Sequence, residues 1–362
     1  MDVDDKSGER VERVQALIQD GNGLQFIPKE YVQPPGLRPN LVNYKSSFAQ
    51  VPVINLFNFQ SNNLDKIRQD VGKACREWGV FQVINHEVPT RLLDDMRDIG
   101  LKFFETPVEH KLKYACKSGS PTSEGYGSKM LVKEDQVLDW RDYFNHHTQP
   151  ISRRNPSCWP DDPPFYRETV QEYSEQIKLL AQRLLAVISE SIGLKSTYIQ
   201  DVISEPYQNI TISYYPACPQ PELALGLQAH SDMGAITLLI QDEVGGLQVL
   251  KEGEWITVQP LRDAIVVNLG DQTQILTNGT YKSAEHRAIV NAHKARLSVA
   301  TFYDPSRQTR IRPAPELVSK DSLPRYREVL YGDYVNAWYT KGPEGKRNID
   351  ELSIKDEHAF TL

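Results

Sequence analysis

Two histidines and one aspartate in the second half of the chain constrain its fold most strongly. His230 and Asp232 are separated by one residue, and His286 follows after two apolar, strand-like stretches. If residues 228–232 form a β-strand, His230 and Asp232 project to the same side and can bind one metal ion together. Two imidazoles and one carboxylate are the protein ligands of the facial triad, which holds non-haem Fe(II) and leaves coordination positions open. The pattern therefore predicts strands from distant parts of the chain that meet at a metal.

A second pair, Arg296 and Ser298, follows shortly after His286 in an otherwise apolar run. The two residues have the same strand spacing, and a guanidinium fork beside a hydroxyl suits a carboxylate. Each short pattern alone is weak, because a His-x-Asp pair is more often a hydrogen-bonding pair at a strand end and an Arg-x-Ser pair is more often solvated. Their order along the chain favours the functional interpretation. An open metal site beside a carboxylate clamp is typical of an oxygenase that uses a 2-oxo acid.

Further motifs surround these two clusters. They are Tyr214-Tyr215-Pro216, residues 219–226, Asn268-Leu269-Gly270-Asp271, Tyr281-Lys282-Ser283, Glu285-His286-Arg287 and, upstream, residues 78–86. With the His-x-Asp and Arg-x-Ser pairs, this set resembles the plant soluble 2-oxoglutarate- and Fe(II)-dependent dioxygenases, which include anthocyanidin synthase, flavonol synthase and the jasmonate oxidases. The similarity extends over about residues 50–310.

The resemblance implies a role for each matching residue. His230, Asp232 and His286 are expected to bind Fe(II), and Arg296, Ser298 and Tyr215 to contact 2-oxoglutarate. The implied enzyme hydroxylates or desaturates a small molecule with Fe(II), 2-oxoglutarate and O2, and it releases succinate and CO2. Ascorbate is expected to support activity, and no catalytic residue is expected beyond the metal centre. Two other classes stay open: an iron oxidase of the same fold that uses no 2-oxo acid, and a binding protein without activity.

The expected fold is mainly β with flanking α-helices. Apolar residues recur at helical spacing over residues 64–78, 92–104 and 170–188, whereas short strands separated by Gly, Asn and Asp dominate from residue 209 onward. The resemblance implies a double-stranded β-helix, a form of jelly roll, braced by the N-terminal helices. The expected regions are an arm over residues 1–50, an N-terminal region over 51–165, the iron-binding core over 166–310 and a helical tail over 311–362.

Composition excludes several classes of function. A net charge of −7 argues against nucleic-acid binding, which requires a basic surface. Residues 1–13 carry mixed charges without an apolar leader, and no stretch approaches the roughly 20 apolar residues of a membrane span. We therefore expect a cytoplasmic, monomeric enzyme whose partner is a small molecule.

Two positions depart from the family pattern. Ser213 stands where the family usually has asparagine, near the expected oxo acid, so one cosubstrate hydrogen bond is expected to differ. Glu87 stands where the N-terminal motif usually continues with glycine. A residue with a side chain adopts a positive φ there only at a cost in free energy.

The resemblance also places substrate-binding residues. The positions that line the substrate pocket in the family are Tyr126, Tyr143, Asn145, Thr211 and Phe302. Phe302 offers a ring for stacking, although simple core packing explains it equally well. His146 and His147 are expected on the surface or in a loop; the alternative is that one of them approaches the pocket as a polar contact.

The residue at position 211 predicts the charge of the substrate. The position is commonly lysine in flavonoid-oxidising relatives and arginine in jasmonate oxidases, but here it is Thr211. A neutral aromatic or terpenoid metabolite is therefore expected. Oxidation of a flavonoid or of a carboxylate-bearing hormone such as jasmonate is the alternative, with Lys129 or Lys133 as the missing cation.

Overall fold

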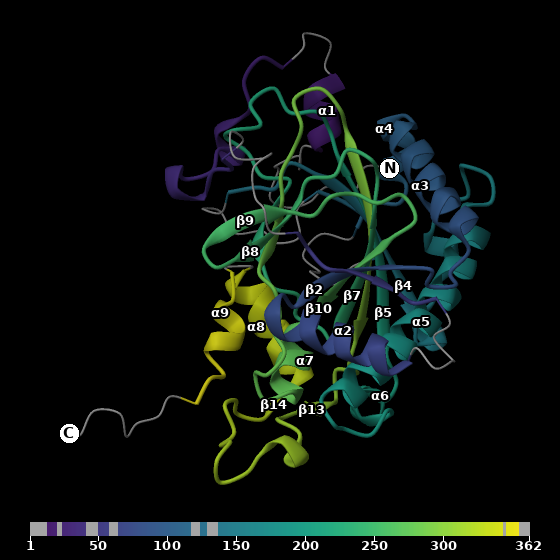
Figure 1. Ribbon diagram of the computed structural model, residues 1–362. Coiled ribbons are helices and arrows are strands. Elements are labelled where there is room, and N and C mark those ends of the chain that lie inside the picture. Colours follow the sequence, from purple (N-terminus) through teal and green to yellow (C-terminus); the bar gives the residue numbers. More distant parts are fainter. Residues whose placement is uncertain are drawn as a thin grey trace.

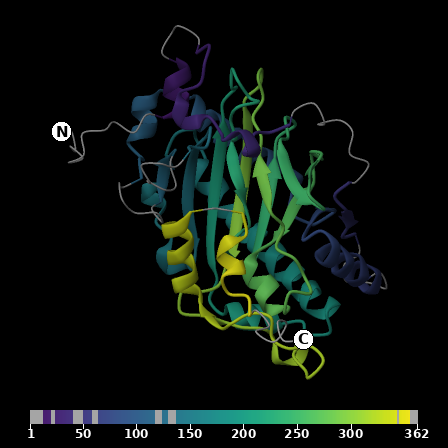
Figure 2. The same cartoon turned by 90° about the vertical axis from the view of Figure 1, so that its left-hand side faces the viewer.

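Two β-sheets form the core of the computed structural model, which describes residues 13–19, 24–40, 50–57, 64–116, 124–128, 137–342 and 345–354 (Figures 1 and 2). Eight strands form the large sheet in the order β1-β2-β10-β7-β12-β5-β4-β3, and four form the small sheet in the order β6-β11-β8-β9. Only the β1–β2 pair is parallel among the described strands of these sheets. Side chains of both sheets line one cavity. The expected double-stranded β-helix is confirmed.

The strands of the large sheet are β1 (Val53–Asn55), β2 (Val80–Ile84), β10 (Ile265–Leu269), β7 (Ile236–Gln241), β12 (Arg296–Asp304), β5 (Tyr207–Tyr215), β4 (Asp142–Gln149) and β3 (Gly125–Gly127). Those of the small sheet are β6 (Leu227–His230), β11 (His286–Ala288), β8 (Leu247–Lys251) and β9 (Glu254–Thr257). A separate hairpin pairs β13 (Arg310–Ile311) with β14 (Val329–Leu330).

The predicted helices are α2 (Leu64–Glu77), α3 (Thr90–Glu105) and α5 (Tyr166–Ser191), which cover the large sheet (Figure 1). Shorter helices are α1 (Val14–Gln19), α4 (Val108–Leu112), α6 (Tyr198–Ile203), α7 (Asp271–Leu276), α8 (Tyr331–Lys341) and α9 (Arg347–Asp350). Turns of 3-10 helix are η1 (Lys29–Tyr31), η2 (Pro35–Leu37), η4 (Ile151–Arg153), η5 (Pro156–Cys158) and η6 (Pro315–Leu317). None of the helices in the described ranges combines the length and apolar character needed to cross a bilayer.

Alternation along the strands separates the core from the cavity. In β5, Ile212 belongs to the apolar core with the helices, whereas Thr211 and Ser213 line the cavity between the sheets. Helix α3 approaches β5 closely at Gly100, where an added Cβ would lie 2.9 Å from Ile212 Cγ2. A side chain at Gly100 would push the helix from the sheet and move the strand that carries the cavity residues.

The strand expected over residues 228–232 is shorter than predicted. Strand β6 ends at His230, so Asp232 lies in the following loop rather than beside His230 on the same strand. The loop is held by the start of α7, because the Asp271 N–H donates to the Asp232 carbonyl at 2.8 Å. The two ligands still meet, but they do so through this turn and not through strand alternation.

The expectation that His146 lies on the surface or in a loop is wrong, and His147 is half-buried in a strand and not in a loop. Both belong to β4, and His146 is fully buried on the face covered by the helices. The His146 ring lies 2.8 Å from the Ile210 carbonyl through Nδ1 and 3.0 Å from the Tyr166 hydroxyl through Nε2. Burial lowers the pKa of His146 to about 3, so it is a neutral core residue.

The C-terminal helices α8 and α9, yellow in Figure 2, lie in front of the sheets in that view. The chain between them pairs with the strand that carries His230. The Gly345 N–H donates to the Ala229 carbonyl at 3.1 Å, and the Ser231 N–H donates to the Gly345 carbonyl at 3.2 Å. This parallel bridge covers the edge of β6.

The positive φ expected at Glu87 is confirmed, with a value of 67°. Arg183 pairs with the Glu87 carboxylate at the surface. Glu87→Gly should relieve about 1–3 kcal/mol of backbone strain and lose an ion pair worth at most about 1 kcal/mol, for a net stabilisation near 1 kcal/mol. Glu87→Ala keeps the backbone strain and loses the ion pair with Arg183, so it should lower the free energy of unfolding. Urea unfolding midpoints test this prediction, and a Glu87→Gly variant less stable than Glu87→Ala would contradict it.

Candidate metal centre and cosubstrate pocket

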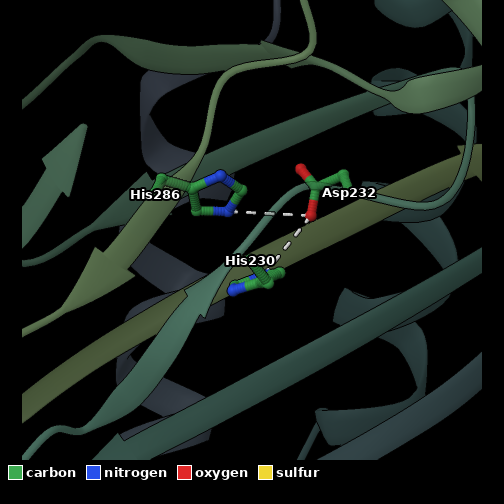
Figure 3. Close-up of side chains that lie close together, drawn as sticks. All are labelled: His230, Asp232 and His286. Atoms are coloured by element: carbon green, nitrogen blue, oxygen red, sulfur yellow. Dashed lines mark ion pairs between the residues drawn. The ribbon is translucent and has the colours of Figure 1, made fainter. Parts of the chain in front are cut away.

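The side chains of His230, Asp232 and His286 lie close together, as Figure 3 shows. His230 is the last residue of β6, and His286 is the first residue of β11. Nε2 of each histidine lies 3.7 Å from Asp232 Oδ1, and the three potential ligand atoms lie within 4.8 Å of one another. The register places His286 directly opposite His230 in adjacent antiparallel strands. The three residues therefore present two nitrogens and one oxygen to a single point, which is the donor set that suits Fe(II).

Both imidazoles are oriented by backbone carbonyls. Nδ1 of His230 donates to the Gln228 carbonyl at 2.8 Å, and Nδ1 of His286 donates to the Ala284 carbonyl at 3.0 Å. A carbonyl only accepts, so the proton stays on Nδ1 and the lone pair of Nε2 faces Asp232. Burial, with the nearby His286, lowers the pKa of His230 to about 4. The Nε2 lone pair of His230 is therefore available to a metal at neutral pH.

A buried polar cluster supports the loop that carries Asp232. Asn268 lies 3.5 Å from the second carboxylate oxygen of Asp232. The carboxylate of Asp271 accepts hydrogen bonds from the Ser231 hydroxyl at 3.0 Å and from the Tyr334 hydroxyl at 2.7 Å. Asn268 and Asp271 belong to a motif of the sequence for which no function was predicted. Such outer partners orient the groups that hold a metal.

The clamp residues share one face of the large sheet. Arg296 lies opposite Tyr215, and Ser298 lies opposite Ser213, in the β12–β5 pair. Arg296 donates to the Ser298 hydroxyl at 3.2 Å, and its guanidinium carbon lies 4.7 Å from the centre of the Tyr215 ring. Burial raises the pKa of Tyr215, but the charges of Arg296 and Arg141 and the hydrogen bonds with Ser298 and Ser213 together outweigh burial, so the pKa falls below its usual value.

Arg296 is a buried cation that requires an anion. It is 3% exposed, and among the described residues it forms no ion pair with a carboxylate, although the charge of Asp242 acts on it from a longer distance. Its Nε is buried without a hydrogen-bond partner among these residues. Leaving a buried charge unpaired costs several kcal/mol, whereas a carboxylate held by the guanidinium fork satisfies it. The pocket thus fits a 2-oxo acid whose far carboxylate reaches Arg296.

The five residues expected to bind substrate are divided between two faces of the sheet. Thr211 and Phe302 line the cavity. Tyr143 and Asn145 pair with Ser213 and Thr211 and so share their side of the sheet, but they are not among the residues that line the cavity.

The expectation that Tyr126 lines the substrate pocket is wrong. Tyr126 pairs with Phe144 on the opposite face and packs in the apolar core. Its hydroxyl donates to Asp142 at 3.3 Å. Because the family position was carried over without the register of the short β3–β4 pair, the sequence did not indicate which face Tyr126 occupies.

Sequence reasoning missed a cation in the cavity. Arg141, directly before β4, is 3% exposed and lines the cavity with Thr211. Arg287 also lines it, and its guanidinium lies over the Trp255 ring. Strand alternation could have indicated Arg141, because it is two residues before Tyr143 and so projects to the same side of the sheet. Lys129 and Lys133, the cations considered earlier, lie outside the described residues.

Comparisons with known proteins agree with this geometry. Residues 206–305 match the model of the 2OG-Fe(II) oxygenase superfamily, and residues 51–162 match the model described as non-haem dioxygenase in morphine synthesis N-terminal. Jasmonate-induced oxygenase 2 of Arabidopsis thaliana is 41% identical over 96% of this chain and 94% of its own. Leucoanthocyanidin dioxygenase of Malus domestica is 38% identical over 89% and 93%. The crystal structure of JOX2 in complex with 2OG, Fe and JA covers 96% of this chain and 99% of that one, with 40% identity and a TM-score of 0.87.

Proposed function

The chain belongs to the 2OG-Fe(II) oxygenase superfamily, and from that premise we propose the residues that perform its reaction. It is an Fe(II)- and 2-oxoglutarate-dependent dioxygenase of a small molecule. His230, Asp232 and His286 bind the iron. The iron, once bound, supplies oxidation by O2 coupled to conversion of 2-oxoglutarate to succinate and CO2.

The protein's own residues contribute position and charge. Arg296 binds the far carboxylate of 2-oxoglutarate through its guanidinium fork, with Ser298 and Tyr215 as additional contacts. The buried cluster around Asp271 keeps the Asp232 loop in place. The apolar walls hold the substrate next to the iron and exclude water. No side chain beyond these is assigned a proton-transfer role.

The substrate we propose is a small, neutral, largely apolar metabolite, such as an aromatic or terpenoid compound, that is hydroxylated or desaturated. The observation that carries this proposal is the pair formed by Thr211 and Asn145, in which the Thr211 hydroxyl donates to the Asn145 amide oxygen at 3.1 Å. These two neutral side chains form a hydrogen bond with each other at the position where a cation would bind the carboxylate of an acidic substrate. The cavity is also lined by the apolar side chains of Leu227, Leu239 and Ala300.

A second candidate is a carboxylate-bearing substrate. JOX2 has been crystallised with JA, and Arg141 and Arg287 bring positive charge to the cavity of this chain. This candidate ranks second because Asp139, whose carboxylate lies 3.7 Å from Arg141, already offsets part of the positive charge of Arg141.

A competition assay tests the charge of the substrate. Succinate release is measured with pairs of neutral and carboxylate-bearing metabolites of similar size, and the wild type should prefer the neutral member. Thr211→Arg should shift the preference toward the acids by about tenfold or more, because it provides a guanidinium fork. Thr211→Val is the matched control and should keep the neutral preference. A wild type that prefers acids, together with an inert Thr211→Arg variant, would contradict the proposal.

We further propose that the enzyme acts as a cytoplasmic monomer. The charge of −7 and the charged surface pairs of the helices support this setting. Size-exclusion chromatography coupled to light scattering tests it, and a stable dimer would contradict it.

A further inference from the structure

Arg141 is linked to β6, which carries His230, and to β5, which pairs with the strand of Arg296 and Ser298. It precedes β4 and reaches the inner face of the large sheet. Its Nη1 donates to the Ser213 hydroxyl at 3.3 Å, and its guanidinium carbon lies 5.4 Å from the centre of the Tyr143 ring. Buried arginines at such a position need defined anionic partners, so its surroundings decide its role.

On one side, Arg141 is tied to the strand of His230. Its Nε lies 3.7 Å from Asp139 Oδ2. The other oxygen of Asp139 accepts from the Gln228 N–H at 3.0 Å and from the Gln228 amide at 3.3 Å. The Gln228 carbonyl in turn accepts from His230 Nδ1. The guanidinium is thus held in a fixed relation to the iron ligand, through two intervening residues.

On the other side, Arg141 is joined to the clamp. Ser213 lies opposite Ser298, whose hydroxyl accepts from Arg296. Ser213 is the position at which the sequence departs from asparagine. An asparagine amide is longer and carries its own donors, whereas the short serine hydroxyl accepts from the guanidinium and leaves it access to the cavity.

The cavity therefore carries one guanidinium on each flank of the expected cosubstrate. A 2-oxo dicarboxylic acid has two carboxylates, one beside the metal and one far from it. We propose that Arg141, with Ser213, binds the carboxylate next to the iron, while Arg296 binds the far one. This inference rests on the proposed function, because it concerns the same cosubstrate. The departure at Ser213 is thereby compensated by an arginine from the segment directly before β4.

Equilibrium binding separates the two arginines. The full chain with Fe(II), without O2, is titrated with 2-oxoglutarate and with 2-oxobutyrate, which lacks the far carboxylate, and heat of binding is measured. Arg141→Met should raise the Kd of both ligands by about tenfold or more, the scale of a lost charge-assisted hydrogen bond. Arg296→Met should raise the Kd of 2-oxoglutarate only. Arg141→Lys should fall between wild type and Arg141→Met.

Controls distinguish positioning from a general loss of structure. Arg154→Met removes another largely buried arginine, which pairs with Glu175 away from the cavity, and should leave both Kd values unchanged. Iron content and thermal unfolding are measured for every variant. If Arg141→Met does not fold, Ser213→Ala replaces it, and this variant should raise both Kd values by a smaller factor.

Three results would overturn the inference. In one, Arg141→Met and Ser213→Ala bind both 2-oxo acids as tightly as wild type. In another, Arg141→Met leaves these Kd values unchanged but raises KM for an acidic organic substrate, which would assign Arg141 to the substrate. In the third, wild-type protein loaded with iron binds no 2-oxoglutarate, and the proposed function then fails as well.

Discussion

Replacement of His286 by alanine is expected to leave a folded protein that retains no iron and releases no succinate. Loss of an outer partner of a metal ligand costs about 10- to 100-fold in affinity or activity, so loss of a ligand should cost more than about 100-fold. His230→Ala should behave in the same way. Asp232→Glu should also fail, because its added methylene moves the carboxylate away from the two Nε2 atoms. Iron per chain and succinate formation are measured together.

The matched control is His146→Gln, which alters a buried histidine outside the metal cluster. It should destabilise the core, because the ring bonds the Ile210 carbonyl and the Tyr166 hydroxyl, but iron content should stay at the wild-type level. Full activity of His286→Ala without added imidazole would remove His286 from the metal site. Equal iron loss in both variants would point to global unfolding instead.

Arg296→Ala should raise the 2-oxoglutarate concentration required for half-maximal activity by at least about 100-fold. Breaking a buried charge pair typically costs about 3–5 kcal/mol, and 100-fold corresponds to about 2.7 kcal/mol. Arg296→Lys should restore only part of the affinity, since an ammonium lacks the planar fork. Initial rates over a range of 2-oxoglutarate concentrations measure the effect.

Arg154→Ala serves as the control, because Arg154 pairs with Glu175 among the helices. It should leave the 2-oxoglutarate requirement unchanged. An unaltered requirement in Arg296→Ala would favour an iron oxidase that needs no 2-oxo acid, and that outcome predicts turnover without succinate.

The periodicity of apolar residues predicted the long helices, because each of them buries a continuous stripe of apolar side chains. The 26 residues of α5 place Val170, Ile177 and Leu184 on one face, so the helical pattern was unambiguous. The two apolar stretches predicted as strand-like between Asp232 and His286 are the strands β7 and β10. The metal cluster was predictable because only a few residue types bind Fe(II) in this arrangement, and their order along the chain is specific.

Details that depend on register were not predictable from one sequence. Tyr126 was placed in the substrate pocket, but the β3–β4 pairing turns it toward the helices. The loop after β6 is held by a hydrogen bond from Asp271, which is far from Asp232 in sequence. Alternation gave a signal for Arg141, but its contact with Ser213 becomes evident only when β4 aligns with β5. Each of these facts is a tertiary contact, and local sequence does not encode it.

The pairing of Gly345 with β6 bears on how the enzyme is assembled during synthesis. The ribosome delivers His230 long before Gly345, and until then the edge of β6 exposes backbone groups that can pair with other chains. Contacts between such distant residues form late, because a long loop must close first. The metal ligands would therefore reach their final arrangement only after the last helices have left the ribosome. Ribosome-bound chains that stop before residue 345 should load iron poorly, even though both histidines and the aspartate have already been made.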